Sequence, residues 1–445
     1  MPLLGGELRH TLGASRFSAR AEGGAGVPGR FPAGEDPTSG PYRLEPLRSR
    51  VDHLAFGGSW EGAALAGTQL AAGYRLVSQA ASYAISGTWP ARSDPSREAA
   101  SDRALRLGVL WAEAGRDLVS GLRAEAGGRA EVSPALWESG RVRLAPRASL
   151  RWRAGDRTTV SAAAGRTWQY AQALSAAAPG HDGVAVSGLF WTLAGDTVRA
   201  LRSDVYTLGA ERWLADGVLA SATAYLRDAD GVRIPDPTEG WLADRPPSVG
   251  ARNRARGVDL SLRRLTGRWT GSAAYSYGVS ELEAAGERFP APTGREHTLD
   301  LSGMLRVAGE LRVGAAYTLA SGVRYTRHEW VLEDCAGAAA AGCRFATYAR
   351  PPGAMQAPAY RSLDLLADWS APLGRLQVGA YAQLRNILGR DNVGAYTASR
   401  PVCSKQPGQS CHPILDPDPT SWDPRTNRYL PGLPFVPLAG VRVAL

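Results

Sequence analysis

Lysine is almost absent from this chain, because Lys405 is the only one among 445 residues. The formal net charge of +9 therefore comes from arginine, which is spread along the whole sequence. Proteins that bind nucleic acid gather their cations into patches that contact the phosphate backbone. The dispersed arginines form no such patch in the sequence, so the charge argues against a nucleic-acid partner.

Long hydrophobic runs are also missing. No uncharged apolar segment of the sequence approaches the roughly 18 residues that a membrane-spanning helix needs. This argues against a helical membrane protein. It does not exclude a closed β-barrel, whose strands of about ten residues alternate lipid-facing and interior-facing side chains and give a weak hydropathy signal.

The N-terminus lacks the marks of a secretory signal. Its first residues, MPLLGGELRH, contain no basic segment, apolar core and small-residue cleavage site in succession. Either the protein stays inside the cell, or the true start of its gene lies further upstream.

Cysteine is scarce, and its four copies fall into two pairs: Cys335 with Cys343, and Cys403 with Cys411. Each pair lies in a polar or small-residue segment that we expect to be a loop. Even, local pairing favours two disulfides in an oxidising compartment, so these four residues are disulfide candidates. A zinc site that uses His412 and four unpaired thiols are the alternatives, although zinc ligands more usually lie two to four residues apart.

The feature that dominates the sequence is alternation at every second residue. In ERWLADGVLASATAYLRD, alanines alternate with Ser221 and Thr223, and the run follows the Asp216–Gly217 pair. A period of two is typical of a strand, whereas an amphipathic helix repeats every three or four residues. Asp-Gly between two alternating runs indicates a two-residue hairpin turn.

The same pattern extends in both directions from this hairpin. Strand-like runs are separated alternately by a short turn that contains glycine and by a longer connection that is often rich in proline and aspartate. The expected short turns are Ala66-Gly67, Ala114-Gly115, Gly155-Asp156, Asp216-Gly217, Thr266-Gly267, Ala308-Gly309 and Leu373-Gly374. Counted this way, the chain has about sixteen strands.

Alternation of short and long connections is typical of an outer-membrane β-barrel, in which periplasmic turns are short and extracellular loops are long. We therefore predict an all-β fold, an antiparallel transmembrane barrel. The sequence leaves open whether sixteen strands close by themselves or belong to a larger barrel. The alternative is a soluble β-sandwich or propeller, which would bury bulkier residues and, in a propeller, repeat at a constant length.

The barrel prediction assigns a face to each residue of the hairpin. We expect the side chains on one alternation to face lipid: Ala220, Ala222, Ala224 and Leu226. We expect those on the other to face a polar interior: Ser221, Thr223 and Arg227. Four tryptophans beside the short turns suit an aromatic girdle at the headgroups: Trp152, Trp213, Trp269 and Trp369.

Several segments, taken in order, resemble the barrel of TonB-dependent outer-membrane receptors. They are LAPRASLRWRAGDRTTVSAAAGRTWQY, SDVYTLGAERWLADGVLASATAYLRD, RGVDLSLRR and YRSLDLLADWSAPLGRLQVGAYAQLRNILGRDN. The last residues, GVRVAL, keep Gly440, Val443 and Leu445 at the spacing of the family's C-terminal strand, although the family more often ends in an aromatic residue.

This resemblance implies energised uptake of a scarce nutrient or chelate across the outer membrane of a Gram-negative-type bacterium. It implies contact with lipid, with an unknown small-molecule ligand, and with the inner-membrane energy-transducing TonB protein. Family members carry a signal peptide, a TonB-contacting segment, a plug domain and 22 strands. We expect residues 1–445 to be a partial barrel domain without a plug, from a truncated or internally started reading frame. The alternative is a passive 16-strand pore or a surface adhesin without energy coupling.

Other motifs do not indicate an enzyme. GAGVPG matches a dinucleotide fingerprint, but Pro28 and the residues after it suit a loop, not a strand and helix. The acidic residues near Cys335 and in the last long connection, Glu333, Asp334, Asp416, Asp418 and Asp423, are candidate calcium ligands that we interpret as solvated loop charges. No G-x-S-x-G elbow is present. We therefore expect no catalytic, cofactor-binding or metal-binding residues, and no ligand-binding residue is selected.

Overall fold

The computed structural model describes most of the strand-forming sequence. The described residues are 4–12, 15–25, 29–30, 43–44, 48–63, 67–88, 97–133, 142–176, 188–195, 198–235, 248–291, 294–325, 328–333, 344–349, 353, 355–396, 429–431 and 434–444. They contain no helix that is long and apolar enough to cross a membrane.

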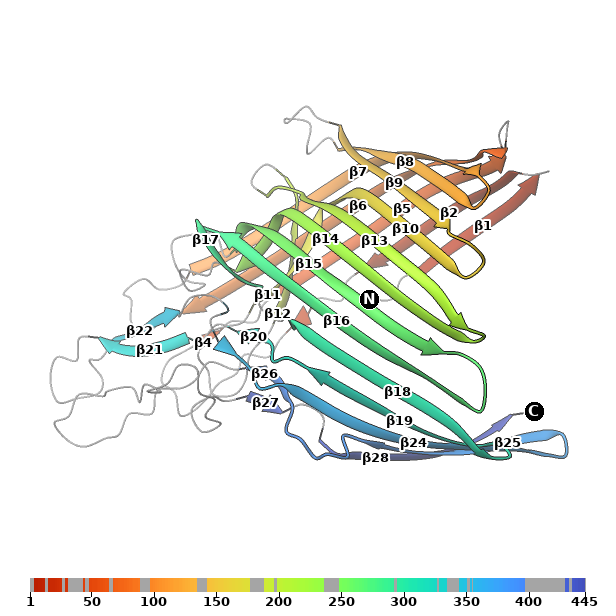
Figure 1. Cartoon of the computed structure of the whole chain (residues 1–445). Helices are drawn as coiled ribbons and strands as arrows, with labels where there is room; N and C mark the ends of the chain where they lie inside the picture. Colours follow the sequence, from red (N-terminus) through yellow and green to blue (C-terminus); the bar gives the residue numbers. More distant parts are fainter. Residues whose placement is uncertain are drawn as a thin grey trace, which may run out of the picture.

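One antiparallel sheet of twenty strands makes up most of this structure (Figure 1). Its long strands are β1 (Leu4–Leu12), β2 (Ser15–Ala25), β5 (Arg48–Ala63), β6 (Gln69–Thr88), β7 (Arg97–Val119), β8 (Leu122–Val132), β9 (Arg143–Arg153), β10 (Thr158–Gln169), β13 (Leu201–Ala215), β14 (Val218–Pro235), β15 (Ser248–Arg264), β16 (Trp269–Ala284), β18 (His297–Ala308), β19 (Leu311–Ala320), β24 (Tyr360–Leu373), β25 (Leu376–Arg385) and β28 (Val436–Ala444). Three short strands pair with the ends of inner strands: β3 (Gly29–Arg30) with β5, β4 (Arg43–Leu44) with β6, and β17 (Glu287–Pro290) with β16.

Four two-stranded sheets lie outside the main one. They are β11 (Ala171–Ala176) with β12 (Gly188–Leu193), β20 (Arg324–Tyr325) with β23 (Met355–Gln356), β21 (His328–Glu333) with β22 (Arg344–Ala349), and β26 (Val393–Tyr396) with β27 (Tyr429–Pro431).

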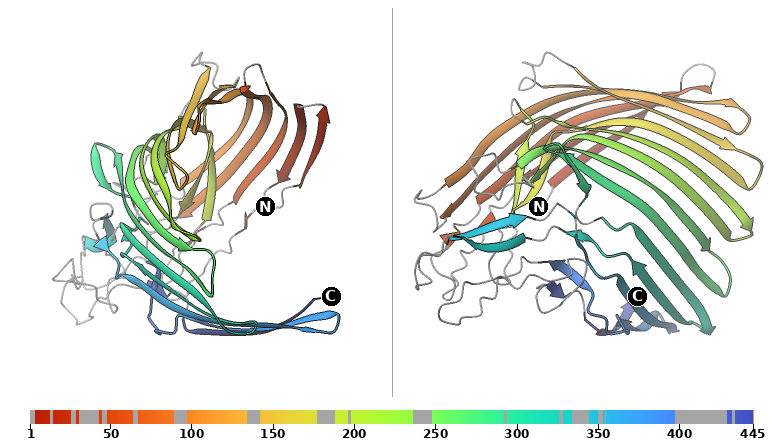
Figure 2. Two further views of the ribbon diagram at one scale, coloured as in Figure 1. Left: turned by 45° about the vertical axis from the view of Figure 1, so that its right-hand side comes forward. Right: turned by 60° about the vertical axis from the view of Figure 1, so that its left-hand side comes forward.

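The long strands pair in chain order, each with the next, so the sheet is a meander. It curls strongly, with β1 and β28 at its two edges (Figure 2). Within the described residues β1 pairs with β2 and β28 pairs with β25, and no pairing joins β1 to β28. The predicted all-β antiparallel fold is confirmed, and the described sheet is an open, curled wall.

Five of the seven predicted short turns are confirmed and one is wrong, while Ala66 of the predicted Ala66-Gly67 turn lies outside the described residues. At Asp216–Gly217, Ala215 of β13 pairs with Val218 of β14, and Gly217 has φ +74°, which glycine adopts without strain. The turns at Gly155, Gly267, Gly309 and Gly374 likewise connect successive strands.

The turn predicted at Ala114-Gly115 is wrong. β7 continues through Gly115 to Val119, and the chain turns at Gly121, whose φ is +81°. Gly115 serves packing, because a Cβ added there would lie 2.8 Å from Nη2 of Arg123 on the neighbouring strand. The sequence does not distinguish a glycine that makes room from one that makes a turn.

Glycines on the concave side also lie under aromatic rings. A Cβ at Gly257 of β15 would lie 2.5 Å from the Tyr225 hydroxyl, and one at Gly440 would lie 2.6 Å from the Tyr381 ring. Each ring therefore lies flat across its neighbouring strand because that strand has no side chain there. Such aromatic cover of strand glycines is a device that accompanies curvature in sheets.

Candidate functional site on the concave face

A small β-hairpin, β11–β12, covers one face of the sheet and not the other. β12 contacts β5, β6 and β7, and β11 contacts β14 on the other side of the curl, so the hairpin β11–β12 lies within the concavity. The face beneath it, which includes Ala81 of β6 and Leu105 of β7, is called the concave face. The opposite one is called the outward face.

The outward face is apolar and exposed. Following the register from β10 to β16, one row consists of Ala162, Leu208, Ala224, Val258 and Tyr277. Leu208 is 58% exposed in this row, and Leu226 in the next row is 57% exposed. A monomeric soluble protein rarely exposes so continuous an apolar surface, whereas a barrel presents one to lipid.

The concave face is polar. Ser221 hydrogen-bonds Ser261 across β14 and β15 at 2.7 Å, and Ser272 hydrogen-bonds Ser302 across β16 and β18 at 2.8 Å. Thr223 and Arg227 share the alternation of Ser221, while Ala220, Ala222 and Ala224 share that of Leu226. The face assigned to each residue of this hairpin from the sequence is confirmed.

The tryptophans beside the turns divide between the faces. Trp152, Trp269 and Trp369 follow the outward alternation and are roughly half exposed, in agreement with a girdle. Trp213 pairs with Leu219, next to a bulge, and this pair follows the concave alternation.

Charged groups bind the last strands together on the concave face. Asp368 of β24 accepts a hydrogen bond from Nη2 of Arg312 on β19 at 2.7 Å, and a second from Arg442 on β28. Only 12% of the Asp368 side chain is exposed. Because the two arginines lie on different strands, this carboxylate links β19 and β28 through β24.

A hollow opens in the concave face over β16, β18, β19, β24 and β25. Its volume is about 280 Å³, and its polar lining includes Thr270, Ser302, Asp364 and Gln383. Small residues make the room, because a Cβ at Gly314 would lie 3.1 Å from Sδ of Met304. The hollow offers hydroxyl, carboxylate and amide groups to a solute that enters the concavity.

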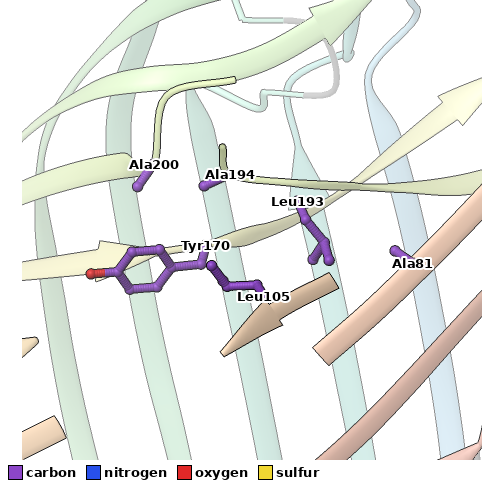
Figure 3. Packing of buried hydrophobic residues seen from close by; sticks show 6 residues of the cluster. All are labelled: Ala81, Leu105, Tyr170, Leu193, Ala194 and Ala200. Atoms are coloured by element: carbon purple, nitrogen blue, oxygen red, sulfur yellow. The ribbon is translucent and has the colours of Figure 1, made fainter. Parts of the chain in front are cut away.

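The hairpin β11–β12 is held by an apolar cluster (Figure 3). Leu193, at the end of β12, is 2% exposed and packs with Ala81 and Leu105 of the sheet. Tyr170, Ala194 and Ala200 complete the buried cluster. Burial of this kind stabilises the folded state by about 1.5–3 kcal/mol for each large side chain. The cluster therefore holds the hairpin against the concave face of the sheet.

Polar contacts orient the same hairpin. The Tyr170 hydroxyl donates to Oε2 of Glu131 at 2.7 Å, and Nε2 of Gln172 donates to the carbonyl of Gly231 at 2.9 Å. The Arg233 amide donates to Oε1 of Gln172 at 2.9 Å. Burial, assisted by the bond to Glu131, raises the pKa of the Tyr170 hydroxyl well above its usual value. Tyr170 therefore remains a neutral donor at physiological pH.

The structure does not test every residue named from the sequence. Cys335, Cys343, Cys403 and Cys411 lie outside the described residues, as do Asp334, Asp416, Asp418 and Asp423. Among the residues described, no group of three or more His, Cys, Asp or Glu side chains is arranged to hold a metal ion.

Sequence reasoning missed the hairpin and its anchors. The alternation of turns and connections predicts only a long connection between β10 and β13, and nothing in this segment marks Tyr170 or Gln172 as a contact for residues some forty to sixty positions away. The only available signal was the aromatic pair Trp168 and Tyr170, over which the Arg143 guanidinium lies at 5.0 and 5.4 Å.

Comparison with known protein structures finds the same fold in outer-membrane receptors. The ferripyoverdine receptor of Pseudomonas aeruginosa superposes with a TM-score of 0.56 and 12% identity, over 88% of this chain and 53% of the receptor. The ferric yersiniabactin uptake receptor FyuA from Yersinia pestis gives 0.55 and 11%, over 86% and 55%. BauA, the ferric preacinetobactin receptor from Acinetobacter baumannii, gives 0.52 and 12%, over 96% and 59%. The chain thus spans little more than half of each receptor.

A search of curated protein sequences gave no match. The family model for the TonB dependent receptor-like β-barrel matches residues 6–387, which is most of the chain. The polar concave wall, the apolar outward face and this match agree, and the chain belongs to the TonB-dependent receptor β-barrel family.

Proposed function

We propose that this chain is the barrel of an outer-membrane receptor that takes up a scarce nutrient, specifically a ferric chelate. The proposal depends on the difference in polarity between the two faces of the sheet. Leu208 and Leu226 face outward, whereas Ser221 and Ser261 face the concavity. In a barrel this arrangement places apolar side chains in lipid and polar ones along a water-filled passage. The similar receptors from three bacteria are named for ferric chelates, which supports this substrate class.

The proposal extends to the domain, location and partners. We infer that residues 1–445 act as one barrel domain in the outer membrane of a Gram-negative bacterium. Uptake would draw its energy from the inner-membrane TonB protein, as membership of the family suggests. No residue of this chain is assigned to ligand or TonB contact.

Iron uptake in a receptor-deficient strain tests the function. The gene that encodes this chain, with its native upstream DNA, is expressed in such a strain, and uptake of radioactive iron is measured for a panel of ferric chelates. We expect uptake of at least one chelate, and we expect it to stop when the TonB gene is deleted. Absence of uptake for every chelate at normal surface expression would contradict the proposed substrate class.

A passive pore is the second candidate. The polar concave face, with Ser221 bonded to Ser261 and Ser272 bonded to Ser302, supports it, because the wall of a passive water-filled channel is also polar. A pore would conduct ions in a planar bilayer and would admit small solutes equally well with and without TonB. An adhesin would do neither, so the two measurements separate these candidates from the receptor.

The pairing of the four cysteines is a separate proposal. We infer that Cys335 pairs with Cys343 and Cys403 with Cys411, because each pair is local and the proposed location is oxidising. Thiol labelling of surface-exposed protein is expected to give no signal before reduction and four labelled thiols after it. Four labelled thiols before reduction would contradict the pairing.

A further inference from the structure

The hairpin β11–β12 joins two parts of the curled sheet that lie far apart along it. β12 contacts β5, β6 and β7, and β11 contacts β14. Four strands of the sheet, β8, β9, β10 and β13, lie between β7 and β14. At about 4.8 Å for each strand spacing, β7 and β14 are roughly 24 Å apart along the sheet. The hairpin therefore crosses the concavity from one side of this arc to the other.

Side chains at the base of the hairpin hold both sides of the arc. Leu193 of β12 packs on Ala81 of β6 and is 2% exposed (Figure 3). Gln172 of β11 pairs across the hairpin with the residue before Leu193. Gln172 is 8% exposed and bonds to β14 twice: its Nε2 donates to the Gly231 carbonyl, and its Oε1 accepts from the Arg233 amide, both at 2.9 Å. An apolar contact on one side and two hydrogen bonds on the other thus start from neighbouring positions of the hairpin.

A third attachment joins the base of the hairpin to the middle of the arc. The hydroxyl of Tyr170, the residue before β11, donates to Glu131 of β8, which is 2% exposed. The Tyr170 carbonyl accepts a hydrogen bond from the Ala194 amide at 2.7 Å, which closes the base of the hairpin. Segments that open and close have few buried contacts and many solvent-exposed hydrogen bonds. The buried contacts of Tyr170, Gln172 and Leu193 indicate the opposite, a base that stays in place.

The concave face beyond β14 lies outside the main contacts of the hairpin. Among the described strands, the extended contacts of β11 and β12, apart from those with each other, are with β5, β6, β7 and β14. Asp259 of β15 is exposed, and the hollow over β16, β18, β19, β24 and β25 has hydroxyl, carboxylate and amide groups in its lining. A solute in the concavity thus meets the hairpin on one side and an exposed polar surface on the other.

We propose that the hairpin β11–β12 is a fixed barrier that directs solutes through the passage. It excludes large solutes from the arc between β5 and β14 and leaves them the polar face from β15 to β25. Tyr170, Gln172 and Leu193 act as positioning residues, because they hold the hairpin and need not touch the solute. This inference rests on the proposed function, since it requires a passage, and it adds to that function a route and a limit on solute size.

Thiol labelling tests whether the hairpin is fixed. Ala81→Cys places a thiol on the sheet beneath Leu193, and Asp259→Cys places one on the exposed concave face. Full-length protein in detergent is treated with a water-soluble maleimide, and peptide mapping assigns each label to its position, so the native cysteines do not interfere. We expect Ala81→Cys to react much more slowly than Asp259→Cys. Adding Gln172→Ala is expected to speed the labelling of Ala81→Cys about tenfold, because two buried hydrogen bonds are lost.

Gln169→Ala is the matched control for Gln172→Ala. The Gln169 side chain donates to the Ala171 carbonyl at 2.7 Å, within the same segment, and β14 takes no part in this bond. Labelling of Ala81→Cys is therefore expected to be unchanged by Gln169→Ala. Heat-modifiable gel mobility reports folding of every variant.

Entry of a large antibiotic tests whether the hairpin is a barrier. Cells that express the chain with its native upstream DNA are exposed to vancomycin, a glycopeptide that an intact outer membrane excludes. We expect cells with the unmodified protein, or with Gln169→Ala, to stay resistant. The double variant Q172A/L193A, which loosens both sides of the base, is expected to cause loss of this resistance at normal surface expression.

The proposal is overturned if Ala81→Cys reacts as fast as Asp259→Cys, because the hairpin would then be a mobile lid. It is also overturned if Gln172→Ala leaves the labelling rate unchanged, or if folded Q172A/L193A leaves the cells resistant to vancomycin. Absence of iron uptake for every chelate, with labelling and vancomycin entry as expected, would contradict the proposed function alone.

Discussion

Neighbouring residues of β14 and β15 meet opposite surroundings. Leu226 and Val258 project outward and are 57% and 39% exposed, while Ser221 and Ser261 hydrogen-bond to each other across the concave face. In water the outward face would be a severe aggregation hazard, and the polar face would be ordinary. The difference shows that the two faces are built for different solvents, hydrocarbon on one side and water on the other.

The largest loss of stability is expected when a charge is placed on the outward face. Leu208→Arg is expected to destabilise the barrel by about 2–4 kcal/mol, because the guanidinium would enter hydrocarbon near the midplane. Thr207→Arg, one residue earlier on the concave alternation, is the control and is expected to cost little. Urea unfolding in lipid vesicles measures both. Equal losses would show that the two faces meet the same solvent.

The second prediction concerns the hairpin β11–β12, which makes an apolar contact with the otherwise polar concave face. Leu193→Ala is expected to destabilise the docked hairpin by about 2 kcal/mol, the lower end of the range for a buried leucine, because it leaves a cavity beside Ala81 and Leu105. Hydrogen exchange should accelerate in β11 and β12 and remain slow in β6 and β7. Leu226→Ala is the matched control, because lipid fills the space that it leaves. Unchanged exchange in the hairpin would show that the cluster does not hold it.

A smaller effect is expected at the charge link between the last strands. Asp368→Asn weakens the bonds from Arg312 and Arg442 and is expected to cost about 1 kcal/mol, since both arginines are half exposed. Asp259→Asn, on the same face and exposed, should be neutral. Faster proteolysis near β28 in the Asp368 variant alone would support the link, and matched rates would contradict it.

The smallest loss of stability is expected for substitutions that remove a hydrogen bond on the concave face. Ser221→Ala and Ser261→Ala are expected to cost about 0.5 kcal/mol each, since a neutral hydrogen bond beside water contributes little. A double-mutant cycle measured by urea unfolding should give a small, favourable coupling. A coupling above about 2 kcal/mol would mean that this face is dry.

Much of the fold was predictable because its signals are local. Alternation through Ala222 and Thr223 assigns faces one residue at a time, and the turn at Asp216–Gly217 depends on a local property, the positive φ that Gly217 adopts without strain. The prediction failed at Ala114-Gly115 for an equally physical reason. Glycine is required both where φ is positive and where a neighbour such as Arg123 needs room, and the sequence looks the same in both cases.

The site was less predictable, since its contacts join distant segments. Asp368 meets Arg442 across 74 positions, and Gln172 meets Gly231 across 59. Composition gives no sign of these partners, because arginine and aspartate occur along most strands.

The sequence by itself determined that this chain forms antiparallel strands with one apolar and one polar face, because side-chain direction alternates with every residue of an extended backbone. Only the tertiary structure decided that β11–β12 folds into the concavity and that Asp368 joins β19 to β28. These features depend on strand order and register, which bring together residues that no local pattern relates.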